Sequence, residues 1–246
     1  VRNNRVRDLG PVGRLGVTGI IAQGGAHEDL TIENNLLTGL RNEINDDTDG
    51  GFPTVNGIFV DDPNEDGEFG LLEDSTIAGN VVRNLESDIA PVGIVLNTEV
   101  DGVEIRGNYV TDLLASQAVD SDDTDDSIEE FEFTYAQGIN HGGPTSGDGV
   151  AIVENTVTDI TSRPPTDAGQ FVGEAVKIDG DASGVTLSRN NLLAPIGVTN
   201  ADGSTLDATC NWWGSSAGPE EASANPPSTS DDQQRDVLGA VDFDPW

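Results

Sequence analysis

The residues best suited to chemistry form one acidic segment, residues 62–67 (DPNEDG), which Glu73 follows. Its spacing matches the pattern D-x-[DN]-x-[DN]-G-x5-E, in which alternate oxygen ligands converge on calcium and the glycine permits a sharp turn. The pattern predicts a structural Ca²⁺ ion held by the side chains of Asp62, Asn64, Asp66 and Glu73 and by the backbone carbonyl of Glu68. Strand patterns flank the segment, which excludes an EF-hand. A simple acidic turn without metal is the alternative.

A second candidate site consists of aromatic residues in long polar segments: Phe52, Phe131, Phe133, Tyr135 and Phe171. Residues 131–135 (FEFTY) alternate aromatic and polar side chains, so one side of an extended strand there is aromatic. Rings presented in this way suit a ligand-binding platform on which sugars stack. The alternative is a small apolar core that pins the long segments to the scaffold.

Catalytic residues do not stand out. Glycosidases need two carboxylates at a defined separation, but carboxylates are so abundant here that no pair is distinguished. The cations available to a lyase-like cleft are Arg41, Arg83, Arg163 and Lys177, and surface ion pairs explain most of them. No serine–histidine–aspartate set, phosphate loop or zinc spacing is present. We therefore assign no catalytic residue.

The elements that must position these residues form a repeat with the pattern apolar-x-x-Asn-x-apolar-x-x-apolar. Its asparagines are Asn4, Asn35, Asn80, Asn108, Asn155, Asn190 and Asn211. A further apolar run precedes most copies, as in Gly57-Ile58-Phe59 and Gly93-Ile94-Val95. Short apolar runs that alternate at period two and end at Gly, Asn or Asp indicate strands, and no window shows a helical stripe.

A unit of two or three short strands cannot bury its apolar side alone, whereas stacked units build one continuous core. We therefore predict an all-β fold, a right-handed parallel β-helix (solenoid) of about seven coils over residues 1–213. The repeated asparagine lies where the chain bends, and its side chain tolerates left-handed backbone geometry. Its amide can donate to and accept from the coils above and below, forming a ladder. Isolated turn asparagines are the alternative.

Spacing between the asparagines varies from 21 to 47 residues, so several coils carry insertions. Three insertions, residues 41–56, 114–137 and 161–174, leave just after the last apolar position of the repeat. Stacking places them side by side along one face, where a rigid scaffold usually carries its binding sites. Residues 214–246 are predicted to form a C-terminal capping tail that folds back over the last coil and its Trp213.

The charge balance restricts the environment and the partners. The chain has 45 acidic and 11 basic residues and a net charge of −34, and Lys177 is its one lysine. Such a surface is typical of halophilic proteins, and it disfavours nucleic acid and anionic lipid as partners. No apolar run is long enough to cross a membrane. The chain opens inside a repeat, so we expect a piece of a longer protein. The single cysteine, Cys210, lies beside two tryptophans and is predicted to be a small buried hydrophobe.

Together, these repeats resemble the parallel β-helix repeat family that includes pectate lyase-like and NosD-type proteins. The ending is similar to that of many haloarchaeal surface proteins of this type, in Asn211-Trp212-Trp213-Gly214, Ala217-Gly218-Pro219 and residues 239–246 (GAVDFDPW). The resemblance covers essentially the whole chain and implies the fold. It implies little about activity, because this architecture serves lyases, hydrolases, epimerases, adhesins and viral spikes.

Three functions remain open on the sequence. The favoured one is a non-catalytic, extracellular or cell-surface module that binds glycans or neighbouring subunits. The second is a polysaccharide lyase or glycoside hydrolase with its cleft on the insertion face. The third is a spike or fibre of a halophilic virus, in which the partners would be other virion subunits.

Overall fold

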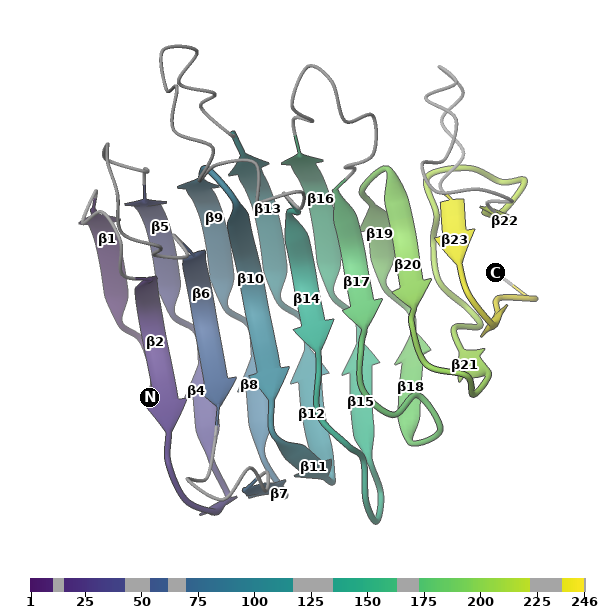
Figure 1. Cartoon of the computed structure of the whole chain (residues 1–246), viewed down its shortest axis with the longest axis horizontal. Coiled ribbons are helices and arrows are strands. Elements are labelled where there is room, and N and C mark those ends of the chain that lie inside the picture. The colour runs from purple at the N-terminus through teal and green to yellow at the C-terminus, as the bar shows by residue number, and fades with distance from the viewer. Residues whose placement is uncertain are drawn as a thin grey trace, which may run out of the picture.

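The computed structural model describes residues 1–10, 16–42, 54–61, 70–116, 135–162, 173–221 and 236–245. Within these residues every helix or strand assigned is a β-strand, and every strand pairing is parallel (Figure 1). The predicted all-β class is confirmed. In the part of the chain described, no helix could span a membrane.

The strands form four sheets, which we name A to D. Sheet A contains β4 (Thr31–Glu33), β8 (Thr76–Ala78), β12 (Val103–Arg106), β15 (Val150–Val153), β18 (Val185–Ser188), β21 (Leu206–Asp207) and β24 (Val241–Asp242). Sheet B contains β1 (Arg5–Leu9), β5 (Leu36–Asn42), β9 (Val81–Ser87), β13 (Tyr109–Ala115), β16 (Thr156–Ser162) and β19 (Asn191–Leu193).

Sheet C contains β2 (Val17–Gln23), β6 (Thr54–Asp61), β10 (Ala90–Asn97), β14 (Gln137–His141), β17 (Glu174–Ile178), β20 (Ile196–Asn200), β23 (Asp236–Leu238) and β22 (Glu220–Glu221). Sheet D contains β3 (His27–Glu28), β7 (Leu71–Glu73) and β11 (Glu99–Asp101). Successive strands along the chain belong to successive sheets, so each strand pairs with strands from the preceding and following rounds. The short strands therefore depend on neighbouring rounds for their hydrogen bonds.

The core lies between the sheets and consists of the apolar positions of the repeat. In sheet C, Ile58, Ile94 and Ile139 stand in register on adjacent strands and are fully buried. In sheet B, Leu37 and Val82 are likewise in register and fully buried. Each such side chain contributes roughly 1.5–3 kcal/mol by leaving water. The columns of aliphatic side chains thus hold consecutive rounds together.

The seven repeated asparagines lie in one column. The Nδ2 of Asn80 donates to Oδ1 of Asn108 at 3.0 Å, and the backbone N–H of Asn80 donates to the same oxygen at 2.9 Å. The same pair of bonds joins every consecutive member from Asn4 to Asn211. Members after Asn4 also donate Nδ2 to a backbone carbonyl of another round, such as that of Ile32 for Asn80.

Left-handed backbone geometry occurs at the residue before each asparagine, not at the asparagine itself, which corrects the sequence interpretation. The φ angles are +58° at Asn3, +61° at Gly79, +59° at Glu154 and +61° at Cys210. The bend therefore comes first and turns the asparagine inward, where its amide joins the column. The expectation that Cys210 is buried is wrong for the same reason: it occupies the bend position, and its side chain is exposed.

Glycines of sheet C allow sheets B and C to approach each other closely. A Cβ atom on Gly57 would lie 2.5 Å from Val82 Cγ1, and one on Gly93 would lie 2.5 Å from Val110 Cγ1. At the far end of the sheet, a Cβ on Gly197 would lie 2.7 Å from the ring of Trp213. Val82, Val110 and Trp213 belong to the asparagine-bearing repeat, so these glycines make space for the opposite wall of the core.

The described part of the C-terminal tail adds strands to two sheets. β23 pairs with β20 in sheet C, and β24 pairs with β21 in sheet A. Val237 is buried, Phe243 packs against the core, and Trp213 is fully buried. The tail thus continues the stacking beyond the last asparagine.

Removing an asparagine side chain from the middle of the column should lower the free energy of unfolding. In Asn108→Ala, the backbone N–H and the side-chain Nδ2 of Asn80 lose the oxygen to which they donate. The backbone carbonyl of Ile77 loses a donor. At roughly 1–3 kcal/mol for each unsatisfied group, we expect a loss of about 3–5 kcal/mol in the free energy of unfolding.

Denaturant unfolding in molar salt measures this loss. Asn4→Ala is the matched control, because Asn4 is the exposed end of the column. Equal losses for the two variants would show that the column does not stabilise the fold.

Candidate functional site

Most residues of the two sites predicted from sequence lie outside the described residues. These are Asp62, Asn64, Asp66 and Glu68 of the calcium loop and Phe52, Phe131, Phe133 and Phe171 of the aromatic set. Glu73 and Tyr135 are described. The residues at which the three insertions leave and rejoin the scaffold are also described.

Those attachment points lie in adjacent positions, as the repeat predicts. Each insertion follows a strand of sheet B and returns at a strand of sheet C: β5 to β6, β13 to β14 and β16 to β17. Asn42, Ser87, Ala115 and Ser162, near the ends of four sheet B strands, are in register with one another. The three long connections therefore start from one edge of the scaffold.

Glu73 ends β7 in sheet D, in register with Glu28 on β3 and Asp101 on β11. Adjacent strands are about 4.8 Å apart, so three carboxylates stand in one row. Among the residues with described positions, no group of three or more His, Cys, Asp or Glu is arranged to hold a metal ion. The calcium site stays a prediction that depends on residues 62–68.

Tyr135 lines an open groove of about 560 Å³ on the outer face of sheet C. We name it the sheet C groove. Side chains from β2, β6, β10, β14 and β17 line it, and they include Ile21, Phe59, Asn97, Asn140 and Lys177. Ile21, Phe59, Val95, Asn140 and Lys177 form one register column across the five strands. The residue after each buried Ile or Val of the sheet C motif faces the groove because side chains alternate along a strand.

A hydrogen-bonded network occupies the β14–β17 end of the groove. Gln137 Nε2 and Thr199 Oγ1 donate to the two oxygens of the buried Glu174 carboxylate, at 2.7 and 2.6 Å. Asn140 Nδ2 lies 3.0 Å from both Gln137 Oε1 and Asp179 Oδ2. These bonds fix the orientation of the side chains.

Lys177 is held between a carboxylate and an aromatic ring. Its Nζ lies 3.2 Å from Asp179 Oδ1 and 6.0 Å from the centroid of the Tyr135 ring. Burial raises the pKa of the Tyr135 phenol, and the charges of Asp179 and Glu174 raise it further. The phenol is thus neutral near pH 7 and suited to donate a hydrogen bond rather than to act as a base.

A smaller set of side-chain hydrogen bonds joins β2, β6 and β10. Asn97 Nδ2 donates to Asp61 Oδ1 at 2.8 Å, and Gln23 Nε2 lies 3.5 Å from Asp61 Oδ2. Phe59 and Ile21 supply apolar surface on the same strands, β6 and β2. The groove thus offers side-chain amides, carboxylates, one ammonium and aromatic rings, the groups that suit a hydroxyl-rich ligand.

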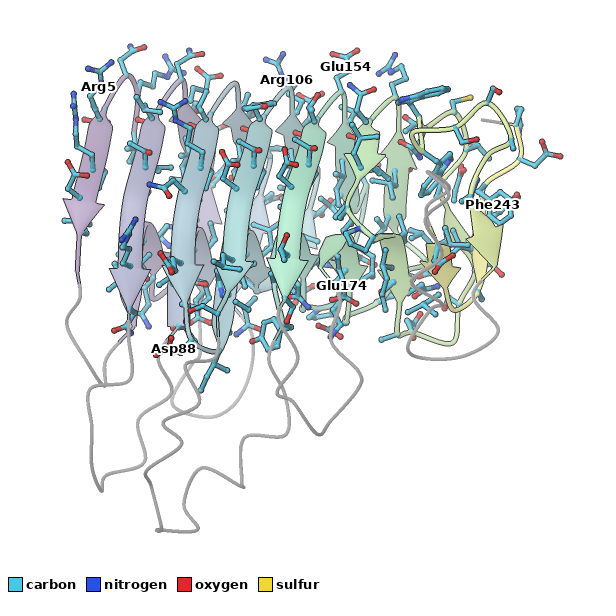
Figure 2. All side chains as sticks on the ribbon, turned by 90° about the horizontal axis from the view of Figure 1, so that it is seen from above. Arg5, Asp88, Arg106, Glu154, Glu174 and Phe243 are labelled. Atoms are coloured by element: carbon cyan, nitrogen blue, oxygen red, sulfur yellow. The ribbon has the colours of Figure 1, made fainter. Side chains whose placement is uncertain are left out.

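The sequence analysis singled out Lys177 but missed Gln137, Asn140 and Glu174. Alignment of Gly138-Ile139-Asn140 with Gly57-Ile58-Phe59 would have placed Asn140 on the outer face. Figure 2 shows Glu174 on the side of the molecule opposite Arg106 and Glu154. The groove is therefore separate from the bends that precede the asparagine column.

The two histidines do not form a joint site. His27 lies in sheet D, whereas His141 occupies an inward position of sheet C in register with Leu96 and Ile178. The His141 ring is fully buried, and neither of its nitrogens has a hydrogen-bond partner. Burial lowers the pKa of His141 to about 4, an effect that Asp181 partly opposes.

Comparisons of the chain with protein-family models, with curated proteins and with solved structures find no match.

Replacing His141 should remove a pH-dependent loss of stability. The unfolded imidazole takes up a proton near pH 6.5, whereas the folded one does so near pH 4. Folding therefore becomes less favourable as the pH falls through this window, by about 3 kcal/mol at the acid end.

His141→Leu matches its neighbour Leu96 and should lack this contribution. The free energy of unfolding of the two proteins, measured from pH 7 to pH 4, should diverge as the pH falls. Both proteins carry the same carboxylates, so the contribution of carboxylate titration cancels in the difference between their free energies of unfolding. A constant difference would mean that His141 is not held neutral in the core.

Proposed function

We propose that the chain is a right-handed parallel β-helix of about seven coils that acts as a glycan-binding module at the surface of a halophilic cell or particle. The sheet C groove is its binding site. The observation that carries the proposal is the pre-oriented set of amides and carboxylates around Tyr135, Lys177 and Phe59.

Sugar hydroxyls both donate and accept hydrogen bonds, and they pair well with side-chain amides and carboxylates. Sugar faces are apolar enough to pack on aromatic rings. The groove offers both surfaces within one open trough, and Lys177 is already neutralised by Asp179. The shape favours a ligand that lies across several strands over one enclosed in a pocket.

The parallel stacking supports a structural role for the rest of the module. Consecutive rounds share hydrogen bonds, the asparagine column and the apolar core, so the scaffold is stiff along its length. A stiff scaffold with one long groove suits a protein that presents a binding surface. A surface protein, a secreted module and a virion fibre would all use it in this way.

An enzyme acting on polysaccharides is the second candidate, because Lys177, Glu174 and Asp179 lie together at one end of the groove. Against it, Glu174 already accepts two hydrogen bonds and the Tyr135 phenol is held neutral. Formation of unsaturated or reducing ends from bound glycans would identify this activity.

Groove variants should weaken glycan binding. In Asn140→Ala and Phe59→Ala, the ligand loses a hydrogen-bonding amide or an aromatic face, and we expect roughly tenfold weaker binding, ~1.4 kcal/mol. A glycan array in molar salt selects the ligand, and titration calorimetry measures its affinity.

The control for this experiment is Asn191→Ala, an exposed amide on sheet B. It should bind as the unsubstituted protein does. Binding that survives both groove substitutions would place the glycan elsewhere.

Salt should stabilise the folded chain. The net charge of −34 opposes compaction in dilute buffer, whereas the Debye length falls to roughly 3 Å at 1 M salt and the repulsion is screened. We expect the melting temperature to rise steeply from low to molar NaCl or KCl. A melting temperature that stays flat over this range would remove the case for a halophilic source.

A further inference from the structure

The outer face of sheet B is basic in a strongly acidic protein. Three of its strands, β1, β5 and β9, carry two carboxylates and four exposed arginines: Arg5, Arg7, Arg41 and Arg83. These four are half of the eight lysines and arginines among the described residues. Within the described chain, Arg41 alone of the four forms an ion pair, with Glu86 at 3.5 Å. We name this surface the arginine face.

The arginines point away from the core because side chains alternate along each strand. Val6, Leu37 and Val82 stand in register and pack into the core, so the residues on either side of them face outward. Arg7 and Arg83 belong to one outward column and lie two strands apart, which corresponds to about 10 Å.

Apolar side chains lie beside these arginines. Leu36 and Val81 occupy the neighbouring outward column, and Tyr109 continues it on β13, where it is 42% exposed. The arginine face therefore combines guanidinium groups with apolar and aromatic surface. Arginine and aromatic residues are enriched in this way at protein–protein interfaces.

Sheet D has the opposite charge. Its three strands and the bends next to them contain six carboxylates and no lysine or arginine, in residues 27–29, 71–74 and 99–101. Glu28, Glu73 and Asp101 stand in one row, one on each strand. None of the six carboxylates forms an ion pair with a described residue. We name this surface the acidic edge.

The arginine face and the acidic edge cannot pair within one molecule. In each round the chain passes from sheet B through sheet C to sheet D, and then through sheet A back to sheet B, so sheets C and A separate the two surfaces. Figure 1 shows β7 and β11 at the lower edge of the molecule and β5 and β9 in its upper half. Each surface therefore keeps its charge exposed in a single copy.

We propose that copies of this chain associate side by side, with the arginine face of one copy on the acidic edge of the next. Both surfaces repeat at the strand spacing of about 4.8 Å, because the same stack of rounds produces them. Arg7 and Arg83 lie two strands apart, as do Glu28 and Asp101, so several arginines can meet carboxylates at once.

A second copy fits the arginine face better than an unrelated acidic ligand, because its carboxylates recur at the same spacing as the arginines. The contact joins two different surfaces and is heterologous, so each copy can bind two neighbours. The proposal does not depend on the sheet C groove.

Molar salt is the condition in which this contact forms. There the Debye length is roughly 3 Å, so the net charge of −34 no longer holds two copies apart and only groups in contact interact. Arginine and carboxylate groups in contact still form bidentate hydrogen bonds. Burial of Val81 and Tyr109 adds an apolar contribution.

Sedimentation velocity of the full chain in molar KCl, over a range of protein concentrations, tests the proposal. The unsubstituted chain should form a concentration-dependent series of oligomers. Arg7→Glu with Arg83→Glu should weaken the association by roughly tenfold or more. Arg106→Glu with Arg189→Glu is the matched control, because it changes the charge equally on exposed arginines outside both surfaces. The melting temperature of each variant in the same salt checks that it folds.

Reversal of the acidic edge distinguishes a specific contact from a general charge effect. Glu28→Arg with Glu99→Arg leaves Glu73, the predicted calcium ligand, in place. This chain should self-associate weakly, but it should associate with the Arg7→Glu/Arg83→Glu chain, because the mixture restores opposite charges at every contact.

Three results would overturn the proposal. The first is an unsubstituted chain that stays monomeric at every concentration in molar salt. The second is association that the control pair of substitutions weakens as much as the Arg7/Arg83 pair. The third is a mixture of the two reversed chains that associates no better than either alone. A monomeric chain that binds polyglutamate through Arg7 and Arg83 would assign the arginine face to a foreign acidic partner instead.

Discussion

The structure depends on parallel pairing between strands that belong to different rounds of the chain. A two- to eight-residue strand cannot bury an apolar face alone, so every strand takes its hydrogen bonds and its core contacts from neighbouring rounds. The asparagine column fixes the register of this stacking. If one round shifted relative to the next, the side-chain amides of the column would lose their partners and remain buried without hydrogen bonds. The free-energy cost of these unsatisfied groups favours a single register of stacking.

Electrostatics acts on this scaffold from outside. Most of the described charged residues lie on the outer faces and turns, because the core cluster is apolar and the asparagine column supplies much of the buried polar surface. There the described arginines are found in the first round, on sheet B and near the bends, whereas Lys177 is the one described cation in sheet C. The lining of the groove carries one ammonium, Lys177, and one carboxylate, Asp179, which form an ion pair. At high salt, screening removes the long-range repulsion between these charges but leaves contacts intact.

The proposed binding surface follows from the same geometry. Alternation along each strand sends one residue of every sheet C motif inward and the next outward, so stacking converts single residues into columns. The inner column is aliphatic, and the outer column runs from Ile21 through Phe59 to Lys177. A groove that crosses the strands is therefore a consequence of the repeat. Its chemistry is set by the outward residues of the sheet C motif, whose type the repeat does not fix.

The sequence by itself determined the all-β class, the strand positions, the inward apolar columns and the asparagine column, because all of these repeat at a fixed place and burial requires the repetition. Only the tertiary structure decided which residue takes the left-handed bend, because the bend and the inward amide are adjacent in sequence and either assignment fits the pattern. It also decided that Cys210 is exposed and that Gln137 and Thr199 meet at the Glu174 carboxylate. These three residues lie on β14, β20 and β17, so their contact depends on the register of strands distant in the chain, which no local pattern contains.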